Sequence, residues 1–288
     1  MKSIGLISLS NGLKEKQEEI INSLESFLKE KNINIIKSDT IYEESENISF
    51  SPKKRAYELM KLYKDDSIDI ICDVSGGDLA NEVLEFLDFE YITNHYKPYF
   101  GYSDLSVILN SLYAKTNTHN YLYQIRNIAL DKTSNSLNDF ISFINEDNDN
   151  LLNFSYKWLQ GEKMEGTLVG GNLRCSLKLA GTKYMPDFKD KILLIESLGG
   201  NVAKITTYLT CYKLLGAFEK CNGIILGSFT EMERDKLTPT VEELIIRIVD
   251  NKDIPIIKTS EIGHAPTSKA TIIGGYYKFN EDTMIINK

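Results

Sequence analysis

The run Lys97-Pro98-Tyr99-Phe100-Gly101-Tyr102-Ser103-Asp104-Leu105-Ser106 contains the change of pattern that decides the fold. Its apolar part, from Pro98 to Tyr102, predicts a short buried strand that stops at a serine. Apolar residues then recur at helical spacing and predict an amphipathic helix; they are Leu105, Ile108, Leu109 and Leu112. Ser103 is therefore expected between the end of a strand and the start of a helix.

Ser103 has two interpretations at such a junction. It can be an exposed nucleophile, because the backbone N–H groups that follow lack intrahelical partners and can bind a developing oxyanion. Alternatively, Ser103 and Asp104 only cap the helix, a role that serine and aspartate commonly fill. This stretch alone leaves both interpretations open.

The composition is that of a folded globular protein. The 288 residues suffice for one large domain or two ordinary ones, and 42% hydrophobic with 26% charged residues exclude a disordered chain. Lys and Arg number 33 against 41 Asp and Glu, which gives a net charge of −8 without a basic tract. This balance argues against a nucleic-acid polymer as partner. No apolar run approaches the ~18 residues that a membrane span requires.

The N-terminal residues and the cysteines favour a cytoplasmic protein. The apolar run at 4–9 is too short for a signal-peptide core and is followed by charged residues at 14–16. The four cysteines show no C-x-x-C spacing and lie far apart, at Cys72, Cys175, Cys211 and Cys221. We expect reduced, mostly buried thiols, no metal site and no cofactor.

Strand and helix patterns alternate through the first half of the chain. Strands are predicted at 2–8, 34–37, 68–74 and 98–102, and the intervening helices include one that starts at Ser51-Pro52 and one over 78–87. This alternation predicts a parallel sheet with helices on both faces. Ligands bind beyond the carboxyl ends of the strands in such sheets, and Ser103 lies at one such end.

A second strand end carries paired glycines, in Asp73-Val74-Ser75-Gly76-Gly77-Asp78. Paired glycines let the backbone approach a ligand closely and turn its N–H groups toward it. They can cradle a phosphate, supply an oxyanion donor opposite Ser103, or simply form a tight turn. The segment lacks both the G-x-G-x-x-G spacing and a Walker lysine, which disfavours a nucleotide-binding fold.

The acidic, asparagine-rich run at 145–150 is the most linker-like segment of the chain. We therefore predict an N-terminal domain over 1–150 that carries the nucleophile and a smaller mixed α/β domain over 151–288. Strands of the second domain are expected at 162–169, 191–195, 223–227, 255–258, 271–274 and 277–279. Its longer helices are expected near 202–215 and 241–249, with a further helix through Leu173, Leu177 and Leu179.

Three histidines and one glutamate are candidates for proton transfer. His95 lies in a polar loop and is expected to be solvated, and His119 is expected at a strand end as a buried, hydrogen-bonded residue. His264 follows a strand and a glycine, which suits a side chain presented into a cleft. Glu196 ends a very apolar strand, although a carboxylate there can also just face water. If both face Ser103, the imidazole takes the serine proton and the carboxylate holds the imidazole.

Six fragments in the same order make the chain resemble the S66 serine peptidases, the L,D-carboxypeptidase family that includes microcin-immunity proteins. They are Gly76-Gly77-Asp78 with Asn81–Leu84 and Leu87-Asp88, Gly101–Leu105, Gly170–Leu173, Ile192–Glu196, Gly227–Thr230 and Ile262–His264. The resemblance implies Ser103 as nucleophile, Glu196 as acid and His264 as base.

The same resemblance implies further features of the site and the fold. The oxyanion hole would be formed by the backbone N–H groups of Gly77 and Asp104, and Gly76 and Asp78 would bind substrate. Family members have a flavodoxin-like N-terminal domain and a smaller C-terminal domain. They usually form homodimers, which we expect here as well.

Two substrate classes remain open from the sequence. Ser75 stands where murein-recycling members typically carry arginine, and the segment Asp78–Glu82 is closer to the microcin-immunity branch. We expect L,D-carboxypeptidase cleavage of murein peptides first, and hydrolysis of peptidyl-nucleotide (aspartyl-adenylate-like) amides second. Trp158 is either a packing residue between the domains or a stacking platform for a base. A non-catalytic protein that binds a small ligand, or a nucleotide-binding regulator, is the rival from another functional class.

Overall fold

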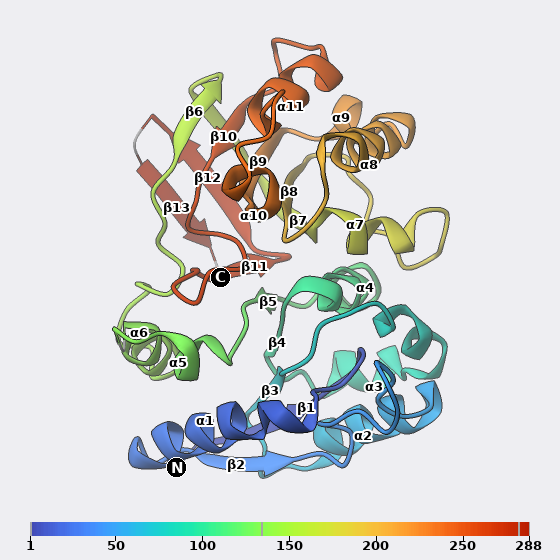
Figure 1. The fold of residues 1–288 in the computed structure, drawn as a ribbon, viewed down its shortest axis with the longest axis vertical. Coiled ribbons are helices and arrows are strands. Elements are labelled where there is room, and N and C mark those ends of the chain that lie inside the picture. Colours follow the sequence, from blue (N-terminus) through green and yellow to red (C-terminus); the bar gives the residue numbers. More distant parts are fainter. Residues whose placement is uncertain (1, 134, 282, 288) are drawn as a thin grey trace.

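The computed structural model describes residues 2–133, 135–281 and 283–287, and it places two sheets one above the other (Figure 1). The first sheet and its helices come mainly from the N-terminal half, and the second sheet comes from the C-terminal half. None of the described helices is long and apolar enough to cross a membrane. The chain is thus a mixed α/β protein with two sheets, as predicted.

The first sheet has the strand order β11-β5-β4-β3-β1-β2. Five of its strands run parallel: β1 (Ser3–Ile7), β2 (Asn34–Lys37), β3 (Ile70–Asp73), β4 (Tyr99–Gly101) and β5 (Asn120–Leu122). Their spatial order, 2-1-3-4-5, is the flavodoxin-like one, whose switch point lies between β1 and β3. The predicted parallel sheet is therefore confirmed, including all four strands expected before residue 103.

Helices on the first sheet form two groups that follow the predicted alternation. They are η1 (Glu15–Gln17), α1 (Glu18–Glu30), α2 (Pro52–Lys64), η2 (Ala80–Phe86), α3 (Phe89–Asn94), η3 (Ser103–Leu105), α4 (Ser106–Thr116), α5 (Asn127–Leu130) and α6 (Asn135–Ile144). α1 contacts α5, which contacts α6, whereas α2, η2, α4 and α3 pack together in the second group. α2 begins as predicted, because the Ser51 hydroxyl accepts a hydrogen bond from the Lys54 N–H and Pro52 occupies the first turn.

The second sheet has the strand order β13-β12-β7-β8-β9-β10-β6. Its strands are β6 (Lys157–Gln160), β7 (Lys163–Asn172), β8 (Lys191–Ser197), β9 (Gly223–Phe229), β10 (Ile256–Lys258), β12 (Tyr276–Asn280) and β13 (Thr283–Asn287). β7 to β10 are parallel to one another, and β6, β12 and β13 add antiparallel edges. The short strands β6 and β13 are not among those predicted from the sequence.

Helices of the second half are short except for two. They are α7 (Leu173–Ser176), η4 (Leu177–Leu179), α8 (Val202–Leu214), α9 (Ala217–Lys220), α10 (Thr230–Arg234) and α11 (Val241–Val249). α8 and α11 match their predictions closely. α11 starts at a capping box in which Thr240 and Glu243 bond to each other's backbone N–H groups.

The two halves of the chain share an edge strand and an apolar core. β11 (Thr271–Ile273) leaves the second half and pairs antiparallel with β5 of the first sheet. One core cluster runs from residues of β1 and β3, such as Ile4 and Ile71, to residues of β7 and β8, such as Leu168 and Leu194. The division at residue 150 stays a prediction, and the excursion of β11 crosses it.

The helix predicted over 78–87 is wrong in type and in its start. The structure has the 3₁₀ helix η2 (Ala80–Phe86) instead, with Val83 buried and Phe86 exposed. Asp78 and Leu79 precede η2, and their N–H groups are bonded to the side chains of Asn11 and Ser10. The helix predicted through Leu173 is likewise only the single turn α7, followed by η4.

Candidate active site

The turn after β4 holds Ser103 in a strained conformation. Ser103 has φ +56°, in the left-handed region that non-glycine residues rarely adopt and that is enriched at functional sites. Gly101 is required just before it, because a Cβ there would lie 2.7 Å from the Cβ of Leu105. η3 and α4 follow at once, so the predicted junction of strand, serine and helix is confirmed.

The interpretation of Ser103 and Asp104 as simple helix caps is wrong. The N-cap positions of η3 and α4 are Tyr102 and Leu105, and neither uses a side-chain cap. The carboxylate of Asp104 is completely buried and accepts hydrogen bonds from the Ser10 hydroxyl (2.7 Å) and the Ala80 N–H (2.9 Å). Asp104 therefore joins the turns that follow β1, β3 and β4 instead of capping its own helix.

The glycine turn after β3 lies against Ser103. A Cβ on Gly76 would lie 3.9 Å from Ser103 Oγ, so the two turns are direct neighbours. Gly77 has φ +132°, and a Cβ on it would lie only 2.1 Å from Asn11 Oδ1, so this position requires glycine. Among the described residues, none accepts a hydrogen bond from the N–H of Gly77 or of Asp104. Both groups proposed from the resemblance as oxyanion donors are therefore available.

Glu196 lies near the end of β8, where it meets His264 from the segment that follows β10. His264 Nδ1 lies 2.9 Å from Glu196 Oε2; the glutamate is completely buried, and the histidine side chain is 11% exposed. The Tyr102 hydroxyl lies 3.3 Å from the same Nδ1, and the two rings meet edge to face at 4.7 Å. Burial, and then the nearby Glu196 carboxylate, raise the pKa of Tyr102 well above its usual value. The contact with Tyr102 places the Glu–His pair beside the residue that precedes Ser103.

Ser103 and His264 are not hydrogen-bonded to each other in this structure. His264 Nε2 is buried, and no described residue pairs with it or with Ser103 Oγ. Such a contact between a nucleophile and its base commonly tightens only when substrate binds. The free Nε2 is the atom that a general base needs, because Nδ1 faces the carboxylate.

Asn172 is a site residue that sequence reasoning missed. Its side-chain NH₂ donates to Glu196 Oε1 (3.1 Å), and its Oδ1 caps α7 by accepting from the Cys175 N–H. Asn172 thus holds the second oxygen of the carboxylate whose first oxygen faces His264. The signal was its place directly after Gly170-Gly171, which extend β7 beyond the strand predicted over 162–169.

The helix that follows Ser103 is docked on β7. The Asn110 side chain bonds to both the N–H and the carbonyl of Gly170, at 2.8 and 2.7 Å. The Ser106 hydroxyl accepts from the Asn172 N–H at 2.9 Å, and a Cβ on Gly171 would lie 2.6 Å from that hydroxyl. The glycines let β7 approach α4 closely, which fixes the two halves of the site relative to each other.

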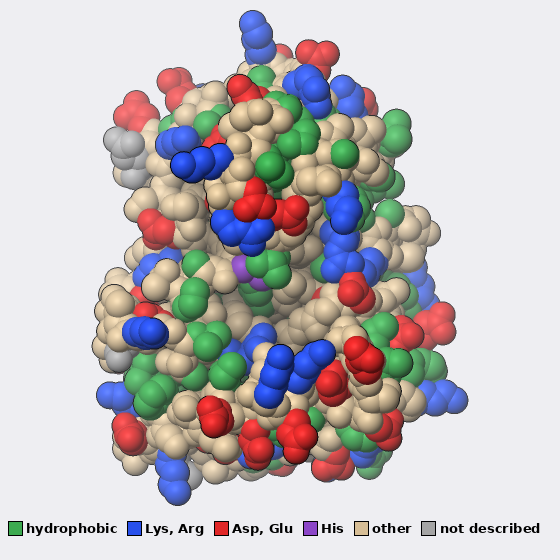
Figure 2. Space-filling view, viewed as in Figure 1, with side chains coloured by type: hydrophobic (Ala, Val, Ile, Leu, Met, Phe, Trp, Pro, Cys, Tyr) green, Lys and Arg blue, Asp and Glu red, His purple; other side chains and the backbone are tan. Residues whose placement is uncertain are grey.

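A cleft of about 380 Å³ opens at this junction, and Figure 2 shows a hollow at the waist of the molecule with Lys and Arg side chains on both sides. The cleft is lined by Gly77, Asp78, Ser103, Asn172, Arg174, Ser197, Leu198, Gly199, Gly200, Lys204, Tyr208 and Glu231. Three residues proposed from the sequence are on this wall, namely Gly77, Asp78 and Ser103. Asp78 is engaged in an ion pair with Arg174, which sequence reasoning had not singled out.

The remaining candidates lie elsewhere. His95 is exposed and stacks on Tyr91, as expected for a solvated histidine. His119 is half-buried and precedes β5, so its prediction at a strand end is wrong. Trp158 lies on the edge strand β6, where its indole N–H donates to the carbonyl of Glu281, and it does not line the cleft. No group of three or more described His, Cys, Asp or Glu side chains could hold a metal ion.

Ser75 is part of a buried hydrogen-bond cluster on Asp73. The Asp73 carboxylate accepts bonds from the Ser75 N–H and hydroxyl, the Leu9 N–H and the Tyr99 hydroxyl. Burial raises the pKa of Asp73 from 3.8 to about 6, against the opposing effect of these donors. Ser75 is therefore a buried support of the glycine turn.

We predict that Asp73 makes the protein less stable as the pH rises from 4 to 6. Its folded pKa exceeds the unfolded value, so the native state binds the proton more tightly and loses about 2–3 kcal/mol of relative stability over this window. Urea unfolding of wild type and Asp73→Asn at pH 4, 5, 6 and 7 measures the difference. The variant should lack this slope, whereas the exposed control Asp66→Asn should retain it; parallel curves for wild type and Asp73→Asn would contradict the assignment.

Two family models match the chain. The N-terminal domain of LD-carboxypeptidase matches residues 4–124, and the C-terminal domain of LD-carboxypeptidase matches residues 165–279. The chain belongs to the S66, or LD-carboxypeptidase, family. The predicted family resemblance is confirmed by these matches, which together include Ser103, Glu196 and His264.

Relatives within the S66 family carry two kinds of name. A putative carboxypeptidase of Vibrio cholerae is 26% identical over 78% of this chain and 76% of its own length. The microcin C7 self-immunity protein MccF of Escherichia coli is also 26% identical, over 74% of this chain and 71% of its own.

Solved structures show the same fold. MccF without ligand has a TM-score of 0.88 at 22% identity, covering 100% of this chain and 96% of that one. A muramoyltetrapeptide carboxypeptidase from Oxalobacter formigenes has a TM-score of 0.82 at 19% identity, covering 99% and 97%. A further MccF structure is described as a complex with aspartyl sulfamoyl adenosine.

Proposed function

We propose that this S66 member is a serine-type peptidase or amidase with Ser103 as nucleophile, His264 as general base and Glu196 as its carboxylate partner. The observation that carries the proposal is the contact of the buried Glu196–His264 pair with Tyr102, next to the strained Ser103. An unpartnered, buried imidazole nitrogen on a ring that contacts the residue before a strained serine suits proton abstraction better than a purely structural role.

Each group has a defined step in this proposal. His264 Nε2 takes the proton of Ser103 Oγ as that oxygen attacks the scissile carbonyl, and Glu196 stabilises the imidazolium that forms. The N–H groups of Gly77 and Asp104 stabilise the tetrahedral oxyanion. His264 then returns the proton to the leaving amine, and it later activates the water that hydrolyses the acyl-enzyme.

The preferred substrate is a murein peptide cleaved in the L,D-carboxypeptidase manner. The cleft carries two cationic side chains, Arg174 and Lys204, which suit a substrate that ends in a carboxylate. Arg174 is already paired with Asp78, whereas no described residue forms an ion pair with Lys204. Lys204 is therefore the cation we propose for the carboxyl terminus of the substrate.

The second candidate is a peptidyl-nucleotide amide. It is favoured by Tyr208, whose ring lines the cleft and could stack on a base, and by the ligand of the MccF complex. Trp158 cannot fill this role from its place on β6. Cleavage of both classes at one serine would fit the same machinery, because in each the serine attacks the carbonyl carbon of an amide.

Product analysis decides between these substrates and tests the function. Purified protein is incubated with an L,D-linked muropeptide and with an aspartyl-adenylate-like amide, and the products are identified by mass. Loss of the terminal D-amino acid supports the first class, and release of the nucleotide moiety supports the second. A serine-directed phosphonate should label Ser103; an unlabelled, folded protein that cleaves neither substrate would instead support a non-catalytic ligand-binding protein or a nucleotide-binding regulator.

Three other parts of the proposal come from the sequence and the family resemblance. We propose a cytoplasmic location, a homodimer, and no nucleic-acid polymer among the partners. Size-exclusion chromatography with light scattering tests the dimer directly.

A further inference from the structure

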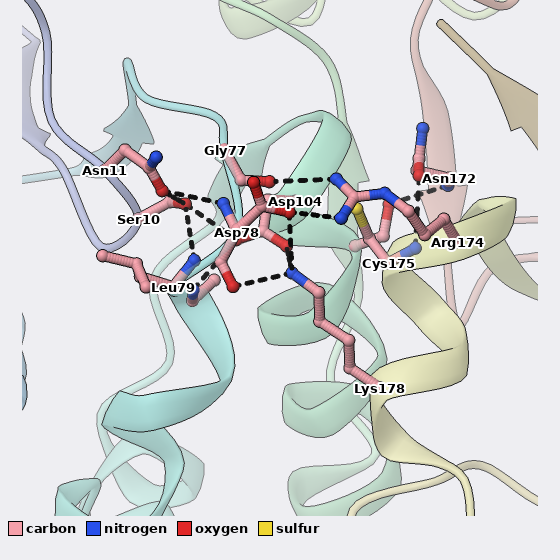
Figure 3. Close-up of polar contacts among 12 residues, drawn as sticks. Ser10, Asn11, Gly77, Asp78, Leu79, Asp104, Asn172, Arg174, Cys175 and Lys178 are labelled. Carbon is pink, nitrogen blue, oxygen red and sulfur yellow. Dashed lines mark hydrogen bonds and ion pairs between the residues drawn. The ribbon is translucent and has the colours of Figure 1, made fainter. Parts of the chain in front are cut away.

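Lys178 reaches from the second half of the chain to both turns of the proposed oxyanion hole. It lies in η4, and its ammonium donates to the carboxylate of Asp104. The carboxylate oxygen Asp78 Oδ1 lies farther away, 3.8 Å from the same nitrogen. The same ammonium donates to the backbone carbonyl of Asp78 at 2.8 Å. Figure 3 shows Lys178 between these two groups, with Arg174 approaching the same turn from α7.

The Asp104 carboxylate requires a compensating cation. Its side chain is completely buried, and its other hydrogen-bond partners are neutral groups, namely the Ser10 hydroxyl, the Ala80 N–H and the Cys175 thiol. Lys178 is the one cation within ion-pair distance of Asp104 among the described residues, and its side chain is only 18% exposed. Breaking such a pair from one side leaves an uncompensated buried charge.

The two groups that Lys178 contacts lie next to the proposed oxyanion donors, the N–H groups of Gly77 and Asp104. The Asp104 N–H belongs to the residue whose carboxylate Lys178 neutralises, and the Asp78 carbonyl follows the Gly77 N–H along one short turn. Arg174 adds a weaker hold on that turn, through the Gly77 carbonyl at 3.3 Å. Oxyanion stabilisation depends on donors fixed in place before the reaction, and small displacements of them are costly.

We propose that Lys178 is a positioning residue that sets the oxyanion hole of the first sheet from the second half of the chain. This inference rests on the proposed roles of Gly77 and Asp104 and extends them to a residue outside the triad. Lys178 touches no reacting atom and acts through the two turns. Arg174 is distinguished from it by exposure, because Arg174 and Asp78 are 43% and 57% exposed, and an exposed ion pair contributes little.

The test compares Lys178→Met, Lys178→Arg and the matched control Lys183→Met on the substrate that the wild type cleaves. Lys183 is an exposed lysine outside the cleft, with its ammonium over the ring of Tyr184. Lys178→Met keeps the length of the stem without the charge, and we expect kcat to fall about 30- to 300-fold with KM within threefold, because transition-state donors are displaced. The kcat of Lys178→Arg should be at least tenfold above that of Lys178→Met. Lys183→Met should change kcat less than about twofold.

A second variant separates positioning from stability. Asp104→Asn combined with Lys178→Met removes the uncompensated charge, so the unfolding midpoint should return to the wild-type value. The kcat of this double variant should stay at least tenfold below wild type, because the Asp78 carbonyl still lacks the ammonium of Lys178. An active wild type with a folded Lys178→Met whose kcat is within threefold would overturn the inference. If the wild type itself is inactive, the proposed function fails. Amide hydrogen exchange then tests the inference about Lys178 by itself. Equal exchange rates of the Gly77 and Asp104 N–H groups in wild type and Lys178→Met would reject it.

Discussion

Replacing Ser103 with alanine is expected to lower kcat by about 10³-fold or more while the protein remains folded. The variant loses the attacking oxygen, whereas the proposed oxyanion donors are backbone groups and stay in place. Alanine meets the same backbone strain at φ +56° as serine does, so the unfolding midpoint should change little. Steady-state kinetics and a urea unfolding curve on the same preparation measure the two quantities.

The control for this experiment is Ser26→Ala in α1. That hydroxyl is exposed and bonds only to the carbonyl of Asn22, far along the chain from the cleft. Its removal should leave kcat unchanged. A Ser103→Ala variant that retains more than a tenth of wild-type activity on a confirmed substrate would rule out Ser103 as the nucleophile.

Replacing Arg55 with methionine is expected to lower the free energy of unfolding by about 3–5 kcal/mol. Arg55 is completely buried, and its guanidinium donates to the carbonyls of Phe50, Leu9 and Leu79. It also pairs with Glu82. Methionine fills a similar volume but leaves these buried carbonyls without a donor, which is the costly half of losing a hydrogen bond.

The matched control is the neighbouring Lys53, whose exposed side chain lies over the ring of Phe86. Lys53→Met should change the unfolding free energy by less than about 1 kcal/mol. Equal effects of the two substitutions in urea unfolding would show that Arg55 does not hold the turns after β1 and β3. Arg55→Lys, which keeps the charge with fewer donors, should fall between wild type and Arg55→Met.

The elements of the first sheet were predictable because their patterns are local. β1, β4 and α2 each combine an apolar period with a clear boundary residue, such as Ser51-Pro52 at the start of α2. The position of Ser103 after β4 followed from the same patterns. The strained φ of Ser103 did not, because a left-handed backbone at a serine has no signature in the apolar pattern.

What the sequence could not predict depends on contacts between distant segments. The bond from Asn172 to Glu196 and the reach of Lys178 to Asp104 join residues that lie 24 and 74 positions apart. The bonds from the N–H groups of Asp78 and Leu79 to Asn11 and Ser10 join the turns after β1 and β3 in the same way. Local propensity is silent on each of these tertiary hydrogen bonds.

The excursion of the chain between β10 and β12 sets the order in which the site can be assembled. After Lys258 the chain leaves the second sheet, passes His264, and reaches β5 of the first sheet as β11 (Thr271–Ile273) before it returns. During synthesis the outer edge of β5 therefore stays open until about residue 273 has emerged. The stretch of chain that closes this edge also carries the proposed base, so completion of the first sheet and of the proposed Glu196–His264 pair requires the same late-synthesised segment.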